Sequence, residues 1–213
     1  IARDICAILR DLPLELVQVG GPIMPGWREW EVVPMDEIAR GGDWGASYVQ
    51  QVYEWRFGSR PGILFVVWDP SRLYPYLQLD LPVQKWAYTA VDSTNIQGSI
   101  GGPAREALAQ FDRVLAYGRW GSQVIRTIRD RVPYLPHGII PTVYSQPPTE
   151  DEEAWVESTL GAFRGKRTLI GCVAANQPRK DFGLFFHTLA VLLNGGLKVH
   201  GWLHTDVLVK SWS

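Results

Sequence analysis

The sequence predicts an α/β protein built on parallel sheets, and three observations support this prediction. Short apolar runs typical of strands alternate with amphipathic stretches typical of helices along the whole chain. The run Gly62–Trp68 is apolar throughout, as expected for a strand in the middle of a parallel sheet. The segment Thr168–Asp206 has the order strand, loop, helix, strand, and units of this kind join parallel strands.

The composition is that of an ordinary globular protein. The chain has 213 residues, of which 46% are hydrophobic and 20% are charged, with a formal net charge of −1. This balance argues against nonspecific nucleic-acid binding, which relies on a strongly basic surface. No apolar run approaches the ~18–20 residues of a transmembrane helix, and no signal peptide is visible. The two cysteines are distant from each other, so we expect buried thiols, a reducing cytoplasmic compartment and no zinc site.

The first domain is predicted to span residues 1–144 and to be Rossmann-like. It opens with a helix over Ile1–Leu12, where apolar residues recur at helical spacing, followed by a strand over Leu14–Val19. The later elements, in order, are a strand at Glu31–Pro34, a helix at Asp43–Phe57, a strand at Gly62–Trp68, a short helix or turn at Leu73–Leu79, a strand at Lys85–Val91, a helix at Ala104–Phe111, a strand at Arg113–Tyr117, a helix that runs to about Arg131, and a short strand at Tyr134–Leu135.

A Pro-rich and then acidic stretch, Ser145–Glu153, is the predicted linker to a second domain over residues 145–213. Its acidic residues also favour the start of the next helix, Glu152–Phe163. In the strand-loop-helix-strand unit, Asp181 suits the N-cap of the helix and Gly195 suits its C-terminal stop. One such unit leaves an apolar helix face and a sheet edge uncovered, so we expect further chain or another subunit to complete this domain.

The loop Asn176–Lys180 leaves the strand Thr168–Ala174 and opens the helix that begins at Phe182. At the carboxyl end of a parallel strand, such a loop points backbone N–H groups toward the ligand crevice of the sheet. Arg179 and Lys180 add two positive charges to the positive end of the helix dipole. The pattern favours binding of a phosphate or diphosphate, while a solvated basic pair is the open alternative.

Two stretches resemble retaining, nucleotide-sugar-dependent glycosyltransferases of the GT-B type. The first is NQPRKDFG at 176–183 with the strand end LHTD at 203–206, and the second is LPHGII at 135–140. The resemblance implies two Rossmann-like domains facing a cleft. It also implies metal-independent transfer of a sugar from a nucleoside diphosphate sugar, the donor substrate, to an acceptor hydroxyl. The basic residues of the loop would then hold the diphosphate, and Thr205 would lie near the nucleotide.

The sequence departs from the pattern of this family in identifiable places. Ala174, Ala175 and Asn176 stand where the family has Gly-Arg before the lysine, so the resemblance assigns that basic role to Arg179. The family's strand and glycine-rich loop before the first helix do not occur, nor does its acidic motif late in the second domain. We therefore expect that the native protein extends beyond these residues at both ends.

Residues at the strand ends of the first domain are candidates for the acceptor side. Asp92 follows the strand Lys85–Val91, where the resembled enzymes place a catalytic group that is often a histidine. It could orient the acceptor or accept its proton, or it could simply form a turn. Asp69 has the same placement after the preceding strand. His137, in the Pro-His-Gly turn, and Trp120, at a helix start, are further cleft candidates, with surface and packing roles as their alternatives.

Functions of other classes stay open at this point. A Rossmann-like module that binds a nucleotide or anion without catalysis would show the same pattern, as would a GT-B-fold epimerase or phosphorylase. A glycosidase would need Asp69 and Asp92 as its carboxylate pair, and nothing else favours that reading. The sequence does not indicate whether the acceptor is a glycan, a lipid, a protein or a nucleic acid. Arg129, on a predicted helix far from the basic loop, is expected to contribute nothing to binding.

Overall fold

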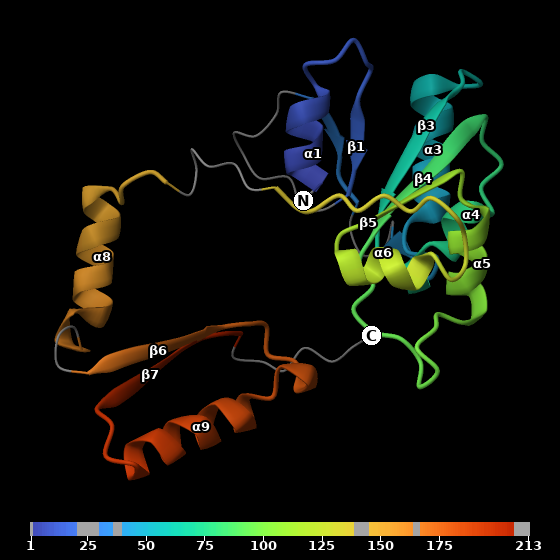
Figure 1. The fold of residues 1–213 in the computed structure, drawn as a ribbon. Helices are drawn as coiled ribbons and strands as arrows, with labels where there is room; N and C mark the ends of the chain where they lie inside the picture. Colours follow the sequence, from blue (N-terminus) through green and yellow to red (C-terminus); the bar gives the residue numbers. More distant parts are fainter. Residues whose placement is uncertain (1, 21–29, 36–39, 139–144, 164–166, 207–213) are drawn as a thin grey trace. The chain divides into compact units, whose positions relative to one another are not determined.

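The computed structural model describes residues 2–20, 30–35, 40–138, 145–163 and 167–206. The chain divides into two compact units, Ile1–Tyr144 (unit 1) and Ser145–Ser213 (unit 2). Both units combine parallel strands with helices (Figure 1). The predicted α/β class with parallel sheets is therefore confirmed.

Unit 1 contains two parallel sheets. The smaller one pairs β1 (Val17–Val19) with β2 (Glu31–Val33), and the larger one has the order β3-β4-β5. The strands of the larger sheet are β3 (Gly62–Val67), β4 (Val83–Thr89) and β5 (Arg113–Ala116). A parallel bridge between Ala116 and Tyr134 extends this row by one more chain segment. The helices are α1 (Ala2–Leu9), α3 (Ala46–Phe57), α4 (Tyr74–Leu77), α5 (Gly102–Gln110) and α6 (Arg119–Ile125), with a 3-10 turn η1 at Pro70–Arg72.

The predicted elements of unit 1 are present, and they differ from the prediction mainly at their ends. The helix predicted from Asp43 begins at Ala46 instead. The reason is that the Asp43 carboxylate accepts hydrogen bonds from the backbone N–H groups of Gly45 (3.1 Å) and Ser47 (2.8 Å), which fixes a turn before the helix. The helix predicted to run to about Arg131 ends at Ile125.

The core of unit 1 lies around the larger sheet and the helices α4, α5 and α6. β4, the central strand, is most buried at its carboxyl end, where Ala87, Tyr88 and Thr89 are all at most 1% exposed. The largest side chains that are almost fully buried are Tyr88, Phe111, Leu73, Leu108 and Ile125. A strand that is buried in this way is typical of the centre of a parallel sheet. The prediction that Gly62–Trp68 lies in the middle of the sheet is wrong, because β3 is an edge strand of the described three-stranded sheet and is mostly half-buried or exposed.

Unit 2 contains the predicted strand-loop-helix-strand unit. β6 (Thr168–Val173) pairs in parallel with β7 (Val199–His204), and α9 (Phe182–Asn194) connects them after a 3-10 turn η3 (Pro178–Lys180). Before them lies α8 (Glu150–Leu160), which continues into the turn η2 (Gly161–Phe163). α8 begins earlier than predicted because Thr149 forms a capping box with Glu152, in which each side chain bonds the backbone N–H of the other residue.

The described part of unit 2 encloses little core. Val199 is the only residue in this part that is buried. α9 packs closely on β7: a Cβ atom added at Gly201 would clash with the side chain of Leu189. Other apolar side chains of the unit stay largely exposed, namely Trp155, Val173, Leu184, Phe186, Val191, Leu193 and Leu197. Across the described ranges of both units, no helix has the length and apolar character needed to cross a membrane.

Candidate functional site

The carboxyl edge of the larger sheet in unit 1 gathers polar groups from successive strands. Asp69 comes shortly after β3, Asp92 after β4, Tyr117 directly after β5, and His137 after the bridge residue Tyr134. The carboxyl ends of parallel strands form the ligand crevice of open α/β sheets. This edge is therefore the first candidate site of the protein.

His137 is held at this edge by two tyrosines. Its ring centroid lies 4.0 Å from that of Tyr117 and 5.4 Å from that of Tyr88. The Tyr88 hydroxyl lies 3.0 Å from His137 Nδ1 and 2.9 Å from the carbonyl oxygen of Leu135. We call Tyr88, Tyr117 and His137 the His137 cluster. The two tyrosines pack against the imidazole, while His137 as a whole is exposed, so the ring is positioned and still accessible to solvent.

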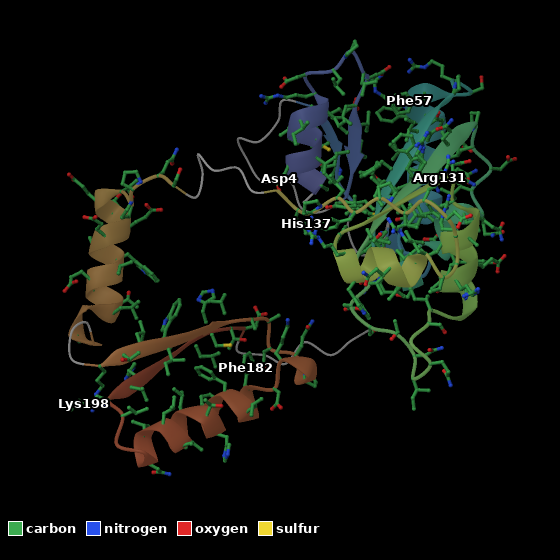
Figure 2. All side chains as sticks on the ribbon, viewed as in Figure 1. Asp4, Phe57, Arg131, His137, Phe182 and Lys198 are labelled. Atoms are coloured by element: carbon green, nitrogen blue, oxygen red, sulfur yellow. The ribbon has the colours of Figure 1, made fainter. Side chains whose placement is uncertain are left out.

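The surroundings shift the pKa values of all three residues of the cluster in the direction that favours the neutral side chain. Burial, followed by the neighbouring Tyr88 and Asp69, raises the pKa of Tyr117 to about 12. Burial also raises the pKa of Tyr88 above its ordinary value. Desolvation lowers the pKa of His137, and the carboxylate of Asp4 on α1 opposes this effect. Figure 2 shows Asp4 and His137 on the same side of unit 1. At pH 7 the imidazole is therefore mostly neutral.

The structure links only some of the predicted acceptor-side residues. His137 belongs to the cluster, and Asp69 acts on Tyr117 electrostatically. Asp92 is exposed, and its described partner is the neighbouring Ser93 hydroxyl at 3.4 Å, which is a turn interaction rather than a link to the cluster. Trp120 lies in the first turn of α6 and is 48% exposed. The described contacts therefore join His137 and Asp69 to the cluster and leave Asp92 outside it.

Sequence reasoning missed Tyr88 and Tyr117. Both lie at the carboxyl end of a strand, which was the signal that selected Asp69 and Asp92. A tyrosine near a strand end usually contributes to packing, so the residue type alone does not single them out.

In unit 2, the sheet edge brings together Asn176 and Thr205. The ladder between β6 and β7 continues past its last pair, since the N–H of Ala174 donates to the carbonyl of His204 at 3.2 Å. Thr205 therefore sits beside the start of the loop that contains Asn176, and both residues are half-buried. The Oγ1 atom of Thr205 is buried without a hydrogen-bond partner among the described residues. A buried hydroxyl of this kind requires an explanation, and a bound polar ligand is one.

The loop itself differs from the expectation in one respect. Its N–H groups at Gln177, Lys180 and Asp181 donate to carbonyls within the loop, those of Ala175, Gln177 and Pro178. The Asp181 carboxylate caps α9 by accepting from the N–H of Leu184 at 3.0 Å, as predicted for an N-cap. These donors are therefore occupied, and the cap places a negative charge at the helix end. An anion here would depend on side chains more than on the helix N-terminus.

Of the two basic residues of the loop, the structure describes the side chain of Lys180 only. The side chain of Lys180 is exposed, at the end of η3. The side chain of Arg179 lies outside the described part of the chain, so its predicted role stays a prediction. Together, Lys180, Asn176 and Thr205 offer an ammonium, an amide and a hydroxyl at one sheet edge. No group of three or more His, Cys, Asp or Glu side chains in the described ranges is arranged to hold a metal ion.

An apolar pocket lies elsewhere in unit 1. It has a volume of about 890 Å³ and is lined by α1, β1, β3 and α3, including Cys6, Val17, Val52 and Phe65. Its lining contains none of the residues predicted for the site. The predicted site residues and this apolar pocket are therefore separate in unit 1.

The buried thiol of Cys6 is expected to make the free energy of unfolding of unit 1 fall at alkaline pH. Burial raises the pKa of its thiol to about 11, so the folded state keeps the proton where the unfolded state loses it. This contribution is complete below the ordinary thiol pKa of about 8.5 and is lost as pH rises through the folded value. We expect Cys6→Ala to decline less in unfolding free energy between about pH 9 and 11, by at most about 2–3 kcal/mol. Urea unfolding at several pH values measures this, and parallel curves for both proteins would contradict it.

Comparisons with known families and with curated proteins found no family model and no protein that matches this chain.

Proposed function

We propose that this protein is a glycosyltransferase of the GT-B type, which transfers a sugar from a nucleoside diphosphate sugar to an acceptor hydroxyl. The observation that carries the proposal is the sheet edge of unit 2, where Lys180 and Asn176 lie in the loop after β6 and Thr205 follows β7. The Oγ1 atom of Thr205, buried without a hydrogen-bond partner in the described ranges, supports a ligand at this edge. The resemblance of 176–183 and 203–206 to these enzymes supports a nucleoside diphosphate as that ligand.

The chemistry of the proposal requires charge stabilisation on the leaving diphosphate. As the bond between the sugar and the diphosphate breaks, negative charge develops on the diphosphate oxygen. The ammonium of Lys180, joined by Arg179, would stabilise that charge in the transition state, which is commonly the largest electrostatic term in such reactions. Asn176 and Thr205 would donate hydrogen bonds to the nucleotide. Because side chains supply the positive charge, the proposed reaction is metal-independent.

A screen of donors tests this proposal. The protein is incubated with UDP-, GDP-, ADP- and CMP-sugars in the presence of EDTA, and release of the nucleotide is followed with and without candidate acceptors. We expect slow hydrolysis of one donor and faster release of nucleotide when a suitable hydroxyl acceptor is present. Tight binding of a nucleoside diphosphate without turnover of any sugar donor would favour a non-catalytic nucleotide-binding module. Conversion of a donor sugar without any acceptor would favour an epimerase.

A further inference from the structure

We propose that unit 1 binds an amphipathic anion, with its apolar chain in the pocket beside β3 and its carboxylate or phosphate head at Arg72. The inference concerns unit 1 alone and goes beyond the proposed glycosyl transfer, on which it does not depend. Its basis is an apolar pocket that adjoins an arginine held against two indole rings.

The pocket follows β3 along its length. Every residue from Ile63 to Trp68 lines it, a stretch of about 16 Å at the ~3.3 Å rise per residue of a strand. The other walls come from α1, β1 and α3, with apolar side chains such as Leu9, Val19 and Val52 (Figure 1). Its volume of about 890 Å³ lies in the range of ~300–1,000 Å³ that is usual for small-molecule sites. The space therefore suits an extended apolar chain.

The charged residues in the described lining, Glu15 and Arg40, lie toward opposite ends of β3. Glu15 forms an ion pair of 2.8 Å with Arg60, which precedes the amino end of β3. The Arg40 guanidinium lies 5.9 Å from the ring centre of Trp44, and this ring packs against Trp68, directly after the carboxyl end of β3. The amino end of the pocket therefore holds an ion pair, while a guanidinium lies at the carboxyl end.

Arg72 is fixed beside the carboxyl end by two tryptophans. Its guanidinium carbon lies 4.1 Å from the ring centre of Trp44 and 4.7 Å from that of Trp68. Such cation–π contacts position the planar group without using its N–H donors. The side chain is half-buried, the described ranges contain no hydrogen-bond or ion-pair partner for its guanidinium, and none of its nitrogens is buried. The donors of Arg72 are therefore positioned in advance and accessible to a ligand.

The two indoles are themselves held in place by the buried Tyr76. Its hydroxyl accepts from Trp68 Nε1 at 3.1 Å and donates to the Trp44 carbonyl at 2.6 Å. Trp44 has a φ of 59°, in the left-handed region that a bulky residue rarely adopts, and strain of this kind is frequent at ligand clamps. Since Arg40 and Arg72 both contact the ring of Trp44, their guanidinium groups lie close together. An anionic head is therefore favoured here over a neutral one, and a carboxylate or phosphate can accept two bonds from one guanidinium.

The first test compares head groups on the same apolar chain. The full protein is titrated by calorimetry with dodecanoate, dodecyl phosphate, dodecanol and dodecyltrimethylammonium, each below the concentration at which it aggregates. We expect at least one of the two anions to bind about tenfold or more tightly than dodecanol, and the cation to bind more weakly than dodecanol. The tighter anion identifies the head as a carboxylate or a phosphate. Equal affinity of the anions and dodecanol, or no binding of any of the four, would overturn the proposal.

The second test removes the guanidinium. Arg72→Gln should weaken binding of the preferred anion by about tenfold to hundredfold and leave binding of dodecanol unchanged. Arg72→Lys keeps the charge without the planar fork, so its loss should be smaller. Arg113→Gln is the matched control, because Arg113 also contacts an indole, that of Trp86 at 5.0 Å, but lies on β5 outside the pocket lining. It should bind the anion as wild type does. If Arg72→Gln changes the affinities for the anion and for dodecanol by the same factor, Arg72 does not hold the head and the proposal is wrong.

The third test locates the apolar chain through Cys6, whose side chain lines the pocket. The preferred anion is added at ten times its dissociation constant, and alkylation of both cysteines by iodoacetamide is followed by mass spectrometry. Alkylation of Cys6 should slow by about tenfold, since the unoccupied fraction of the protein falls by that factor. Cys172, the free cysteine of unit 2, is the internal reference and should react at the same rate with and without the anion. Unchanged alkylation of Cys6 in the presence of bound anion would place the ligand elsewhere and overturn the proposal.

Discussion

Replacing Lys180 with alanine is expected to weaken the binding of a nucleoside diphosphate by about tenfold to hundredfold. The variant loses a charge-assisted hydrogen bond to the diphosphate, which is worth roughly 1.5–3 kcal/mol. The structure increases the weight of this side chain, because the loop N–H groups at Gln177 and Lys180 already donate to loop carbonyls. Calorimetric titration of the folded variant and the wild type with UDP and GDP measures the change. The difference should shrink at high salt, since the lysine is exposed and its charge is screened.

Lys198→Ala is the matched control for this prediction. Lys198 is also an exposed lysine of unit 2, but it directly precedes β7, so it lies at the amino end of that strand. Figure 2 shows it at the opposite end of unit 2 from Phe182, where α9 begins. The control removes the same net charge from the same unit without touching the loop, and its affinity should match that of wild type. Equal affinity in both variants would remove the diphosphate role from Lys180 and most of the case for a glycosyltransferase.

Most of the fold was predictable from the sequence because local patterns determine it. Apolar runs and helical spacing located β3, β6 and α9. The alternation of strands and helices predicted the parallel pairing of β3 with β4 and of β6 with β7. Element ends were harder to predict, because they depend on single side-chain bonds. Asp43 delays the start of α3, and Thr149 with Glu152 brings forward the start of α8.

The candidate site was only partly predictable, because its geometry depends on contacts between distant parts of the chain. The Tyr88 hydroxyl contacts the backbone of Leu135 and the ring of His137. These two residues lie on a later segment of the chain, after β5 and the bridge residue Tyr134. No pattern within one element indicates that contact. The same holds for the loop of unit 2, where the placement after a strand was predictable but the pairing of its N–H groups within the loop was not.

Arg129 shows most clearly why position in the sequence is a poor guide to role. From the sequence it is expected only to contribute nothing to binding, and that expectation stays a prediction. In the structure it lies beyond the end of α6, and its guanidinium donates to three backbone carbonyls at and after the end of α5. These carbonyls belong to Leu108, Phe111 and Asp112, and the bonds from Arg129 to Leu108 and to Asp112 measure 3.1 Å and 3.2 Å. The last carbonyls of a helix have no partner within it, so Arg129 satisfies groups that would otherwise need one.

Arg129→Ala is therefore expected to lower the free energy of unfolding of unit 1 by about 3–5 kcal/mol. Each hydrogen bond to a charged group contributes roughly 1.5–3 kcal/mol, the three bonds share one guanidinium and are not fully additive, and packing of the arginine stem is lost as well. Arg126→Ala is the control, since this nearby arginine has a single 3.5 Å contact to the Val132 carbonyl, and it should cost less than about 1 kcal/mol. Urea unfolding of the full chain, followed by tryptophan fluorescence, measures both variants. If the two arginine variants unfold at the same urea concentration, the guanidinium does not hold the end of α5, because only Arg129→Ala removes the three bonds to the carbonyls there.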